Sequence, residues 1–218
     1  MSPKIIFIEG NIGAGKTTFL KIIENHNKKV QVIYEPVDEW RKSGMLKKFY
    51  EDPKEFGKTF QFYCLYTRFK LFEEIDDTVD YVFIERSMMC DNFVFAKNCL
   101  SDEEYLQYTI LYQNFLDLYR NLYNYTFNFL YLYQPAWICH RHILKRGRQE
   151  ENTITLDYIQ SLEQFHNSWL RSISEEEING LFVWKDNYQT YMTSTLEGTN
   201  RTEPALVLLE QVLNTIQN

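Results

Sequence analysis

The residues best suited to chemistry lie near the start of the sequence, where Gly10-Asn11-Ile12-Gly13-Ala14-Gly15-Lys16-Thr17 fits the pattern G-x-x-x-x-G-K-[ST]. In this pattern the glycines let several backbone N–H groups point into one concavity, and the helix that begins there adds positive potential. The lysine reaches the outer phosphates of a nucleotide, and the hydroxyl ligates Mg²⁺. The segment, with the adjacent Thr18, therefore predicts a nucleotide-phosphate site.

The flanking residues support this interpretation. Residues 4–9 form a short apolar run rich in β-branched side chains, which is typical of a buried parallel strand. Residues 18–23 carry apolar side chains at helical spacing. A strand before the motif and a helix after it are the context that the motif requires, so the alternative, a glycine-rich turn with a surface lysine, is disfavoured.

Four further apolar segments are predicted to be strands, with helical stretches between them: residues 30–34, 81–84, 127–133 and 181–184. Strands that alternate with helices predict an α/β fold with a parallel sheet. The helix that starts at Ser101 begins with a capping box, in which Ser101 and Glu104 satisfy each other's free N–H groups. Its broad apolar stripe predicts burial on more than one side.

Charged residues follow three of these strands. Glu35 comes after the second strand, Glu85 and Arg86 follow the third, and a basic run over residues 140–148 follows the fourth. Ligands bind beyond the carboxyl ends of parallel strands, so these groups are expected near the phosphate loop. Carboxylates and arginines there predict phosphoryl transfer, in which a base orients the acceptor hydroxyl and cations neutralise the phosphoryl group. Taken singly, each could be an ordinary surface acid, ion pair or solvated helix face.

Composition narrows the classes of function. The chain has 218 residues, of which 44% are hydrophobic and 24% charged, and this predicts one globular domain over residues 1–218. The net charge of −7 argues against a nucleic-acid polymer as partner. The four cysteines show no metal-ligand spacing, and no apolar run reaches membrane-spanning length, so no membrane partner is predicted. No targeting segment is seen, and we predict a soluble cytoplasmic protein.

Six ordered motifs resemble the deoxynucleoside kinase family, close to the deoxycytidine and deoxyguanosine kinases. The matches run from about residue 4 to residue 186. They are G-N-I-G-A-G-K-T-T, E-P-V-x-x-W from Glu35, F-Q-F-Y-C-L-Y-T-R at 60–68, E-R-S-x-x-x-D at 85–91, R-G-R-Q-E-E at 146–151 and a helical stretch at 154–170. The resemblance implies a three-layer P-loop nucleoside kinase fold with a five-stranded parallel sheet flanked by helices, a helical lid at about 141–152 and a homodimer.

The resemblance also implies a reaction, the transfer of the γ-phosphate of ATP or another NTP to the 5′-hydroxyl of a deoxynucleoside. Glu35 would be the base, and Arg86 would hold the hydroxyl and the incoming phosphate. Mg²⁺ would be held by Thr17 and, through water, by Glu85. The implied donor-binding residues are Gly10, Asn11, Ile12, Gly13, Ala14, Gly15, Lys16, Thr17, Thr18, Arg141, Arg146 and Arg148.

Seven residues are implied for the nucleoside: Trp40, Tyr50, Gln61, Arg68, Asp91, Phe95 and Glu151. Trp40 and Phe95 would sandwich the base, while Tyr50 and Glu151 would bind the sugar 3′-hydroxyl. Gln61 can pair with a base edge that carries both donors and acceptors. If Arg68 and Asp91 face each other deeper in the pocket, Asp91 is an acceptor that suits an amino-bearing base. Deoxycytidine or a purine deoxynucleoside is then preferred over thymidine.

The lid departs from the family pattern R-x-x-x-R-x-R. Arg141 and Arg146 are five residues apart, so Arg141 would point about 100° away from the other lid arginines on a helix. His142 occupies the position that the pattern gives to arginine. Either the helix contains an extra residue, or His142 or Lys145 substitutes. The family's T-x-P-E before the lid is Tyr133-Gln134-Pro135-Ala136 here, which could alter how the lid helix starts.

Three other functions compete with this prediction. A nucleoside monophosphate kinase, of the thymidylate kinase type, would need extra arginines for the acceptor phosphate. A switch GTPase would carry D-x-x-G after a strand and N-K-x-D for guanine, and neither pattern occurs. An inactive interaction protein on the same fold is disfavoured because Lys16, Thr17, Glu35 and Arg86 are all intact.

Overall fold

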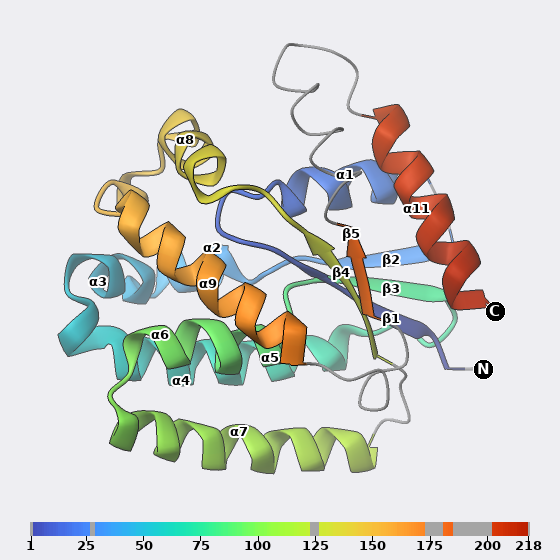
Figure 1. The fold of residues 1–218 in the computed structure, drawn as a ribbon. Coiled ribbons are helices and arrows are strands. Elements are labelled where there is room, and N and C mark those ends of the chain that lie inside the picture. Colours follow the sequence, from blue (N-terminus) through green and yellow to red (C-terminus); the bar gives the residue numbers. More distant parts are fainter. Residues whose placement is uncertain (1, 27–28, 123–126, 173–180, 185–201, 218) are drawn as a thin grey trace.

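A parallel β-sheet runs through the centre of the molecule in the computed structural model, which describes residues 2–26, 29–122, 127–172, 181–184 and 202–217 (Figure 1). The strands lie in the order β2-β3-β1-β4-β5. Their bounds are β1 Lys4–Glu9, β2 Val30–Ile33, β3 Tyr81–Glu85, β4 Phe127–Leu132 and β5 Leu181–Trp184. The prediction of an α/β fold with a parallel sheet is confirmed. The predicted family match ends at residue 186, which lies outside the described residues.

The central strand β1 pairs in parallel with β3 on one side and with β4 on the other, so that Ile6 lies beside Phe83 and Asn128. The side chains of β1 from Ile5 to Glu9 are all buried. Helices therefore cover both faces of this strand, which explains why it is a continuous apolar run without alternation. Because all the strands are parallel, the ends of β1, β2 and β3 open at one edge of the sheet.

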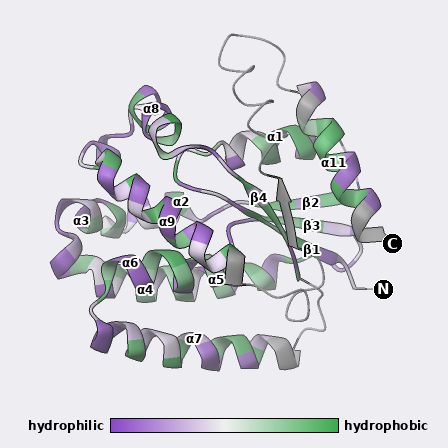
Figure 2. Ribbon diagram, viewed as in Figure 1, coloured by the Kyte–Doolittle hydropathy of each residue, from purple (hydrophilic) through white to green (hydrophobic). Residues whose placement is uncertain are grey.

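Helices pack against both faces of the sheet. The helices are α1 Lys16–His26, α2 Val37–Lys42, α3 Met45–Glu51, α4 Pro53–Lys70, α5 Met88–Cys90, α6 Lys97–Cys99, α7 Asp102–Leu122, α8 Ala136–Arg146, α9 Leu156–Ser172 and α11 Thr202–Gln217. Short helical turns are η1 Leu71–Glu74, η2 Asp91–Ala96 and η3 Gln149–Glu151. Figure 2 shows hydrophobic residues along the strands and hydrophobic and hydrophilic residues interleaved along the helices.

Among the described residues, one hydrophobic core lies on each face of the sheet, and a third cluster around Trp40 and Phe60 joins α2, α3 and α4. On one face, Phe19 and Ile23 of α1 and Leu208 of α11 pack with Ile6 and Ile8 of β1. On the other face, a larger core joins the alternate β1 side chains, such as Phe7, to residues of α4, α7 and α9. This alternation follows from the pleat of the strand, which sends successive side chains to opposite faces. Among the described residues, no helix is long and apolar enough to cross a membrane.

Helix α4 has a well-defined N-terminus. The side chain of Asp52 accepts a hydrogen bond from the backbone N–H of Glu55 at 3.1 Å, and Pro53 occupies the first turn. Both features are favoured at a helix N-terminus. The helix then runs for 18 residues, and its buried face carries Gln61, Cys64 and Arg68 at a spacing of three and four.

Helix α7 has one buried face and one open face. The capping box is confirmed, since the Ser101 N–H donates to the Glu104 carboxylate at 3.1 Å and the Glu104 N–H donates to the Ser101 hydroxyl at 3.4 Å. Leu106 and Ile110 are 61% and 57% exposed. The prediction that this helix is buried on more than one side is therefore wrong for a single chain.

The phosphate loop lies in close contact with β4 and α8. Gly13 has a φ of +83°, and a Cβ atom there would lie only 2.4 Å from the carbonyl oxygen of Cys139 in α8. Gly10 has a φ of +150°, and its Cβ would lie 2.7 Å from the carbonyl oxygen of Leu132. Only glycine permits both this backbone conformation and this approach. Gly13 thus lets α8 lie directly against the loop, and Gly10 does the same for the end of β4.

Candidate active site

A cavity of about 860 Å³ opens at the carboxyl edge of the sheet. Its walls come from the phosphate loop, α2, α3, α4, the end of β3, η2 and the segment around α8 and η3. The structure brings most predicted site residues to this cavity: Ile12, Gly13, Gly15, Lys16, Thr17, Thr18, Glu35, Trp40, Tyr50, Gln61, Arg68, Glu85, Arg86, Asp91, Phe95, Arg146, Arg148 and Glu151. Four others, Gly10, Asn11, Ala14 and Arg141, do not line it.

Three of those four, Gly10, Asn11 and Ala14, belong to the phosphate loop, and their contacts fix its conformation. Ala14 is fully buried, and the Asn11 side chain donates a 2.8 Å hydrogen bond to the carbonyl of Ile159 in α9. Lys16 extends along the loop, where its Nζ donates to the carbonyls of Gly10 and Asn11 at 3.0 Å each. Burial, followed by the nearby Arg86, lowers the pKa of Lys16 to about 8. The lysine is thus held in the loop and is still mainly protonated at neutral pH.

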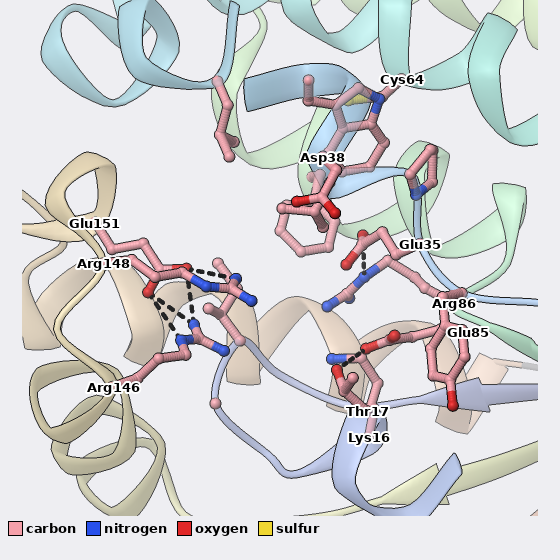
Figure 3. Close-up of a pocket in the computed structure, with 18 of the residues that line it drawn as sticks. Lys16, Thr17, Glu35, Asp38, Cys64, Glu85, Arg86, Arg146, Arg148 and Glu151 are labelled. Atoms are coloured by element: carbon pink, nitrogen blue, oxygen red, sulfur yellow. Dashed lines mark hydrogen bonds and ion pairs between the residues drawn. The ribbon is translucent and has the colours of Figure 1, made fainter. Parts of the chain in front are cut away.

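A hydroxyl group and a carboxylate are hydrogen-bonded at the start of α1. The Thr17 hydroxyl donates a 2.7 Å hydrogen bond to the Glu85 carboxylate, as Figure 3 shows. Mg²⁺ prefers oxygen ligands and is usually bound in proteins by one or two of them together with substrate phosphates. A hydroxyl and a carboxylate beside a phosphate loop therefore fit this ion.

Glu35 lies between two arginines. Its Oε1 accepts from Arg86 Nε at 3.2 Å and is also paired with Arg68 Nη2. Burial by itself would raise the pKa of Glu35, but Arg68 and Arg86 outweigh it and lower the pKa to about 2. The carboxylate is therefore ionised throughout the physiological pH range. It can accept a hydrogen bond from a hydroxyl group placed beside it.

Arg86 is held in a strained backbone conformation, with a φ of +67°. Its backbone N–H donates to the carbonyl of Ile8 at 3.0 Å, which ties the end of β3 to β1. Its guanidinium lies 4.5 Å from the centre of the Phe95 ring and 3.3 Å from the Cys90 sulfur. Left-handed conformations are uncommon outside glycine and cluster at functional sites, where the surroundings maintain them. These contacts fix the direction in which the guanidinium points.

Arg68 also bonds Asp91, through its Nε. Burial raises the pKa of Asp91 to about 6 against the opposing effect of Arg68, so the carboxylate is mainly ionised above neutral pH. The Arg68 guanidinium lies 5.3 Å from the centre of the Trp40 ring. Both members of the pair line the cavity. Arg68 and Asp91 therefore face each other, which is the condition on which the expected base preference depends.

The arginines of the expected lid meet a carboxylate. Arg146 contacts Glu151 from Nε at 3.0 Å and from Nη2 at 2.8 Å, and Arg148 donates to the same carboxylate at 3.2 Å. Figure 3 shows this group across the cavity from Glu35 and Arg86. Glu151 is buried, and each arginine is about one-third exposed. The two guanidinium groups thus share one internal counter-ion.

The structure does not bring Arg141 to the cavity. It is exposed, and its guanidinium lies 5.8 Å from the centre of the Trp137 ring on the outer side of α8. His142 and Lys145 line the cavity instead. The reason is helical register, because residues four apart share a face and Arg141 is five residues before Arg146. The placement of Arg141 among the donor-binding residues is therefore corrected.

Several cavity residues were missed by sequence reasoning, among them Leu46 and Phe49 of α3, Cys64 of α4 and Tyr158 of α9. Cys64 could have been found, because it lies three residues after Gln61 and four before Arg68 on the same helix face. The α3 and α9 residues have no such signal. Their approach to the cavity depends on tertiary packing between distant segments.

Comparison with known proteins shows to which family this chain belongs. The family model described as "Deoxynucleoside kinase" matches residues 6–201, most of the chain. The chain belongs to the deoxynucleoside kinase family. This kinase is 30% identical over 211 residues to the probable deoxycytidine kinase of Fowlpox virus, covering 88% of this chain and 86% of the relative.

Two further relatives have similar identities to this kinase. Human deoxycytidine kinase is 32% identical over 199 residues, covering 77% of this chain and 75% of the relative. The mitochondrial deoxyguanosine kinase of Xenopus laevis is 29% identical over 212 residues, covering 81% and 76%. This kinase is accordingly an ATP-dependent phosphotransferase of nucleotide salvage.

The first prediction concerns Glu35. Glu35→Gln keeps the shape of the side chain but removes the proton acceptor, and we expect kcat to fall by about 10²–10⁴-fold with a modest change in nucleoside KM. Steady-state rates measure this. Glu51→Gln, the same change at an exposed residue outside the cavity, is the control. Near-normal kcat in Glu35→Gln would show that another group takes the proton.

The second prediction separates the three arginines around α8. Arg146→Ala and Arg148→Ala should each lower kcat more than they weaken nucleoside binding, because the two groups face the cavity and are suited to stabilising the transferring phosphoryl group. Arg141→Ala should change kcat by less than about twofold, since an exposed residue away from the site contributes little. Single-turnover rates and nucleoside affinities distinguish these effects. A loss at Arg141 equal to that at Arg146 would contradict the register found here.

Proposed function

We propose that this chain is a single kinase domain that transfers the γ-phosphate of ATP or another NTP to the 5′-hydroxyl of a deoxynucleoside. One observation carries the proposal: the cavity holds an ionised carboxylate, Glu35, between two guanidinium groups and opposite a phosphate loop. A carboxylate beside a primary alcohol and cations beside the phosphates are what this reaction needs. Residues 141–152 would act as the lid over the donor.

Each part of the proposed mechanism has its own residues. Glu35 orients the 5′-hydroxyl and takes its proton. Because two arginines lower the pKa of Glu35 to about 2, it is a weak base, and the proton moves late, as the new P–O bond forms. Arg86 sits beside Glu35 and stabilises the charge that develops on the transferring group. Lys16 of the phosphate loop, with the lid arginines, binds the donor phosphates. Thr17 and, through water, Glu85 would hold Mg²⁺, which would supply charge neutralisation at the donor phosphates.

The alternative acceptor, a nucleoside monophosphate, is less well supported. Its phosphate would need cations that no carboxylate already holds. Near Glu35, among the described residues of the cavity wall, Arg68 and Arg86 are both paired with carboxylates. A coupled assay of ATP consumption with a panel of deoxynucleosides and their monophosphates separates the two acceptors. Activity with monophosphates alone would overturn the proposal.

The cavity wall also supports a choice of base. The ionised Asp91 can only accept hydrogen bonds, which suits the exocyclic amino group of cytosine or adenine or a ring N–H of guanine. Gln61 is buried, and its Oε1 has no hydrogen-bond partner among the described residues, so it is available to a ligand. Thymine would place a carbonyl against Asp91 and a methyl group against Arg68. We therefore propose deoxycytidine or a purine deoxynucleoside as the substrate, in keeping with the names of the relatives.

The third prediction tests this choice. Unpaired buried polar groups cost about 1–3 kcal/mol each, so thymidine should be disfavoured by about tenfold to a few hundredfold in kcat/KM. Arg68→Met combined with Asp91→Ala should raise the relative use of thymidine, because it removes the charge and the crowding together. Each single change should do less, since it leaves the partner as an unpaired buried charge. The measurement is kcat/KM for deoxycytidine, deoxyadenosine, deoxyguanosine and thymidine.

Two results would defeat this proposal: thymidine as the best substrate of the parent, or an unchanged ranking in the double variant. Because Arg68 also pairs with Glu35, a general loss of activity in the double variant is expected. The readout is therefore the ratio between substrates and not the absolute rate. A matched comparison is the panel measured on Glu35→Gln, in which the ranking should stay as in the parent.

We further propose that this kinase is a homodimer formed through α4 and α7. Leu106, Ile110 and Leu118 form an exposed apolar stripe on α7, and the adjacent α4 exposes Tyr66. Figure 1 shows α7 along the outside of the molecule. Exposed apolar surface on this scale is typical of an interaction site. A two-fold axis would let the same stripe on two chains pack against itself.

The fourth prediction follows from this stripe. Ile110→Glu should convert a dimer into a monomer, because a buried unpaired carboxylate at the interface is costly. Light scattering after size-exclusion chromatography measures the mass. The same substitution at Leu144, which is 62% exposed on α8, should leave the mass unchanged. A monomeric parent at micromolar concentration, or a dimeric Ile110→Glu variant, would refute this interface.

A further inference from the structure

The side chain of His142 in α8 contacts the phosphate loop. His142 is four residues before Arg146 and shares its helix face, whereas Arg141 points outward. Its Nδ1 lies 2.8 Å from the carbonyl oxygen of Gly13. His142 also lines the cavity, as do Lys145 and Arg146. The imidazole thus stands between the loop and the space above it.

The contact with Gly13 fixes which ring nitrogen carries a proton. A carbonyl oxygen can only accept a hydrogen bond, so Nδ1 must be the donor. Nε2 is then the nitrogen left for a ligand in the cavity. In the neutral ring Nε2 presents a lone pair, which repels a phosphate oxygen. In the protonated ring Nε2 presents an N–H group with a positive charge, which binds a phosphate oxygen strongly.

The charges around His142 come from four parts of the chain. The two lid arginines are engaged by Glu151, and Lys16 is engaged by loop carbonyls. His142 is engaged by the loop through Gly13. Glu163, on the adjacent α9, lies near Tyr131, Tyr133 and Cys139. The groups to consider are Lys16 and Thr17 on the loop, Lys145 and Arg146 on α8, Arg148 and Glu151 after it, and Glu163 on α9.

We propose that His142 is a donor-phosphate ligand that binds in its protonated form, so that donor binding is linked to proton uptake. The inference rests on the proposed function, since it assumes that a nucleotide occupies the phosphate loop. Donor phosphates favour the imidazolium over the neutral ring. Imidazole is the side chain that ordinarily changes charge between pH 5 and 8. Donor affinity is therefore highest at the acidic end of that range and falls as pH rises.

The test compares three variants with the parent. His142→Arg keeps a positive charge at every pH, and His142→Gln keeps a donor for Gly13 but is always neutral. His140→Gln is the matched control, because His140 is on the same helix but turns its Nε2 to the carbonyl of Ile154 at 3.1 Å and does not line the cavity. The measurement is the KM for ATP at saturating nucleoside between pH 6.0 and 8.5. Each value is divided by that of the parent at the same pH, which cancels the titration of the ATP phosphates.

The expected result is a ratio that changes with pH. His142→Gln should raise the KM for ATP by about tenfold at pH 6 and by less than about twofold at pH 8.5, since it removes a charge-assisted hydrogen bond that the parent has only when protonated. His142→Arg should bind ATP more tightly than the parent at pH 8.5 and about as tightly at pH 6. His140→Gln should give a ratio near one throughout.

A constant ratio for His142→Gln across pH would show a merely structural role and overturn the inference. If His142→Gln does not fold, a pH dependence in His142→Arg identical to that of the parent would overturn it equally well. Calorimetry with Mg²⁺ and a non-hydrolysable ATP analogue, without nucleoside, repeats the test on binding alone. A protein that binds the analogue but phosphorylates no nucleoside would refute the proposed function and leave this inference to be decided by the pH profile.

Discussion

Two guanidinium groups that share one carboxylate are the interaction on which the rest of the site depends. Glu35, which follows β2, is paired with Arg68 from α4 and with Arg86 from the end of β3, and Arg68 also holds Asp91 of η2. A buried charge is costly unless it is paired, so the buried Arg68, Arg86 and Asp91 depend on one another and on the partly buried Glu35. The same pairing that fixes the Glu35 carboxylate therefore also joins the two ends of parallel strands to α4 and η2.

The cationic side chains of the cavity are held in two different ways. Arg86 is fixed by its backbone conformation, by the Phe95 ring and by Glu35, and Lys16 is fixed by carbonyls of its own loop. The lid arginines are instead held by one side chain, Glu151, at the far side of the cavity. The groups around Glu35 are thus preorganised, and in the proposed reaction they would already lie where charge develops. In that reaction the lid arginines would have to leave Glu151 to reach the donor phosphates.

The elements that local pattern determines were predictable from sequence. The five strands, the capping box at Ser101 and the gathering of Lys16, Glu35 and Arg86 follow from apolar runs, turn chemistry and the rule that parallel strands end at one edge. The sequence-based predictions were wrong or incomplete where helical register or tertiary packing determines the position of a side chain. Arg141 carries the right chemistry but points outward, because α8 runs without interruption to Arg146 and register brings His142 inward. Tyr158 reaches the cavity because α9 packs beside α8. The apolar stripe of α7 predicted burial on more than one side, but one face of this helix is exposed in a single chain.

Glu151 links the two ends of the cavity through counter-ion exchange. Its carboxylate is occupied by Arg146 and Arg148, and Tyr50 lines the same cavity. Anything anionic that draws the two arginines away leaves this carboxylate free to accept a hydrogen bond on the Tyr50 side. By thermodynamic reciprocity, a ligand group that bonds Glu151 from that side would in turn weaken its hold on the arginines. A ligand at either end that exchanges this counter-ion would then lower the cost of filling the other end.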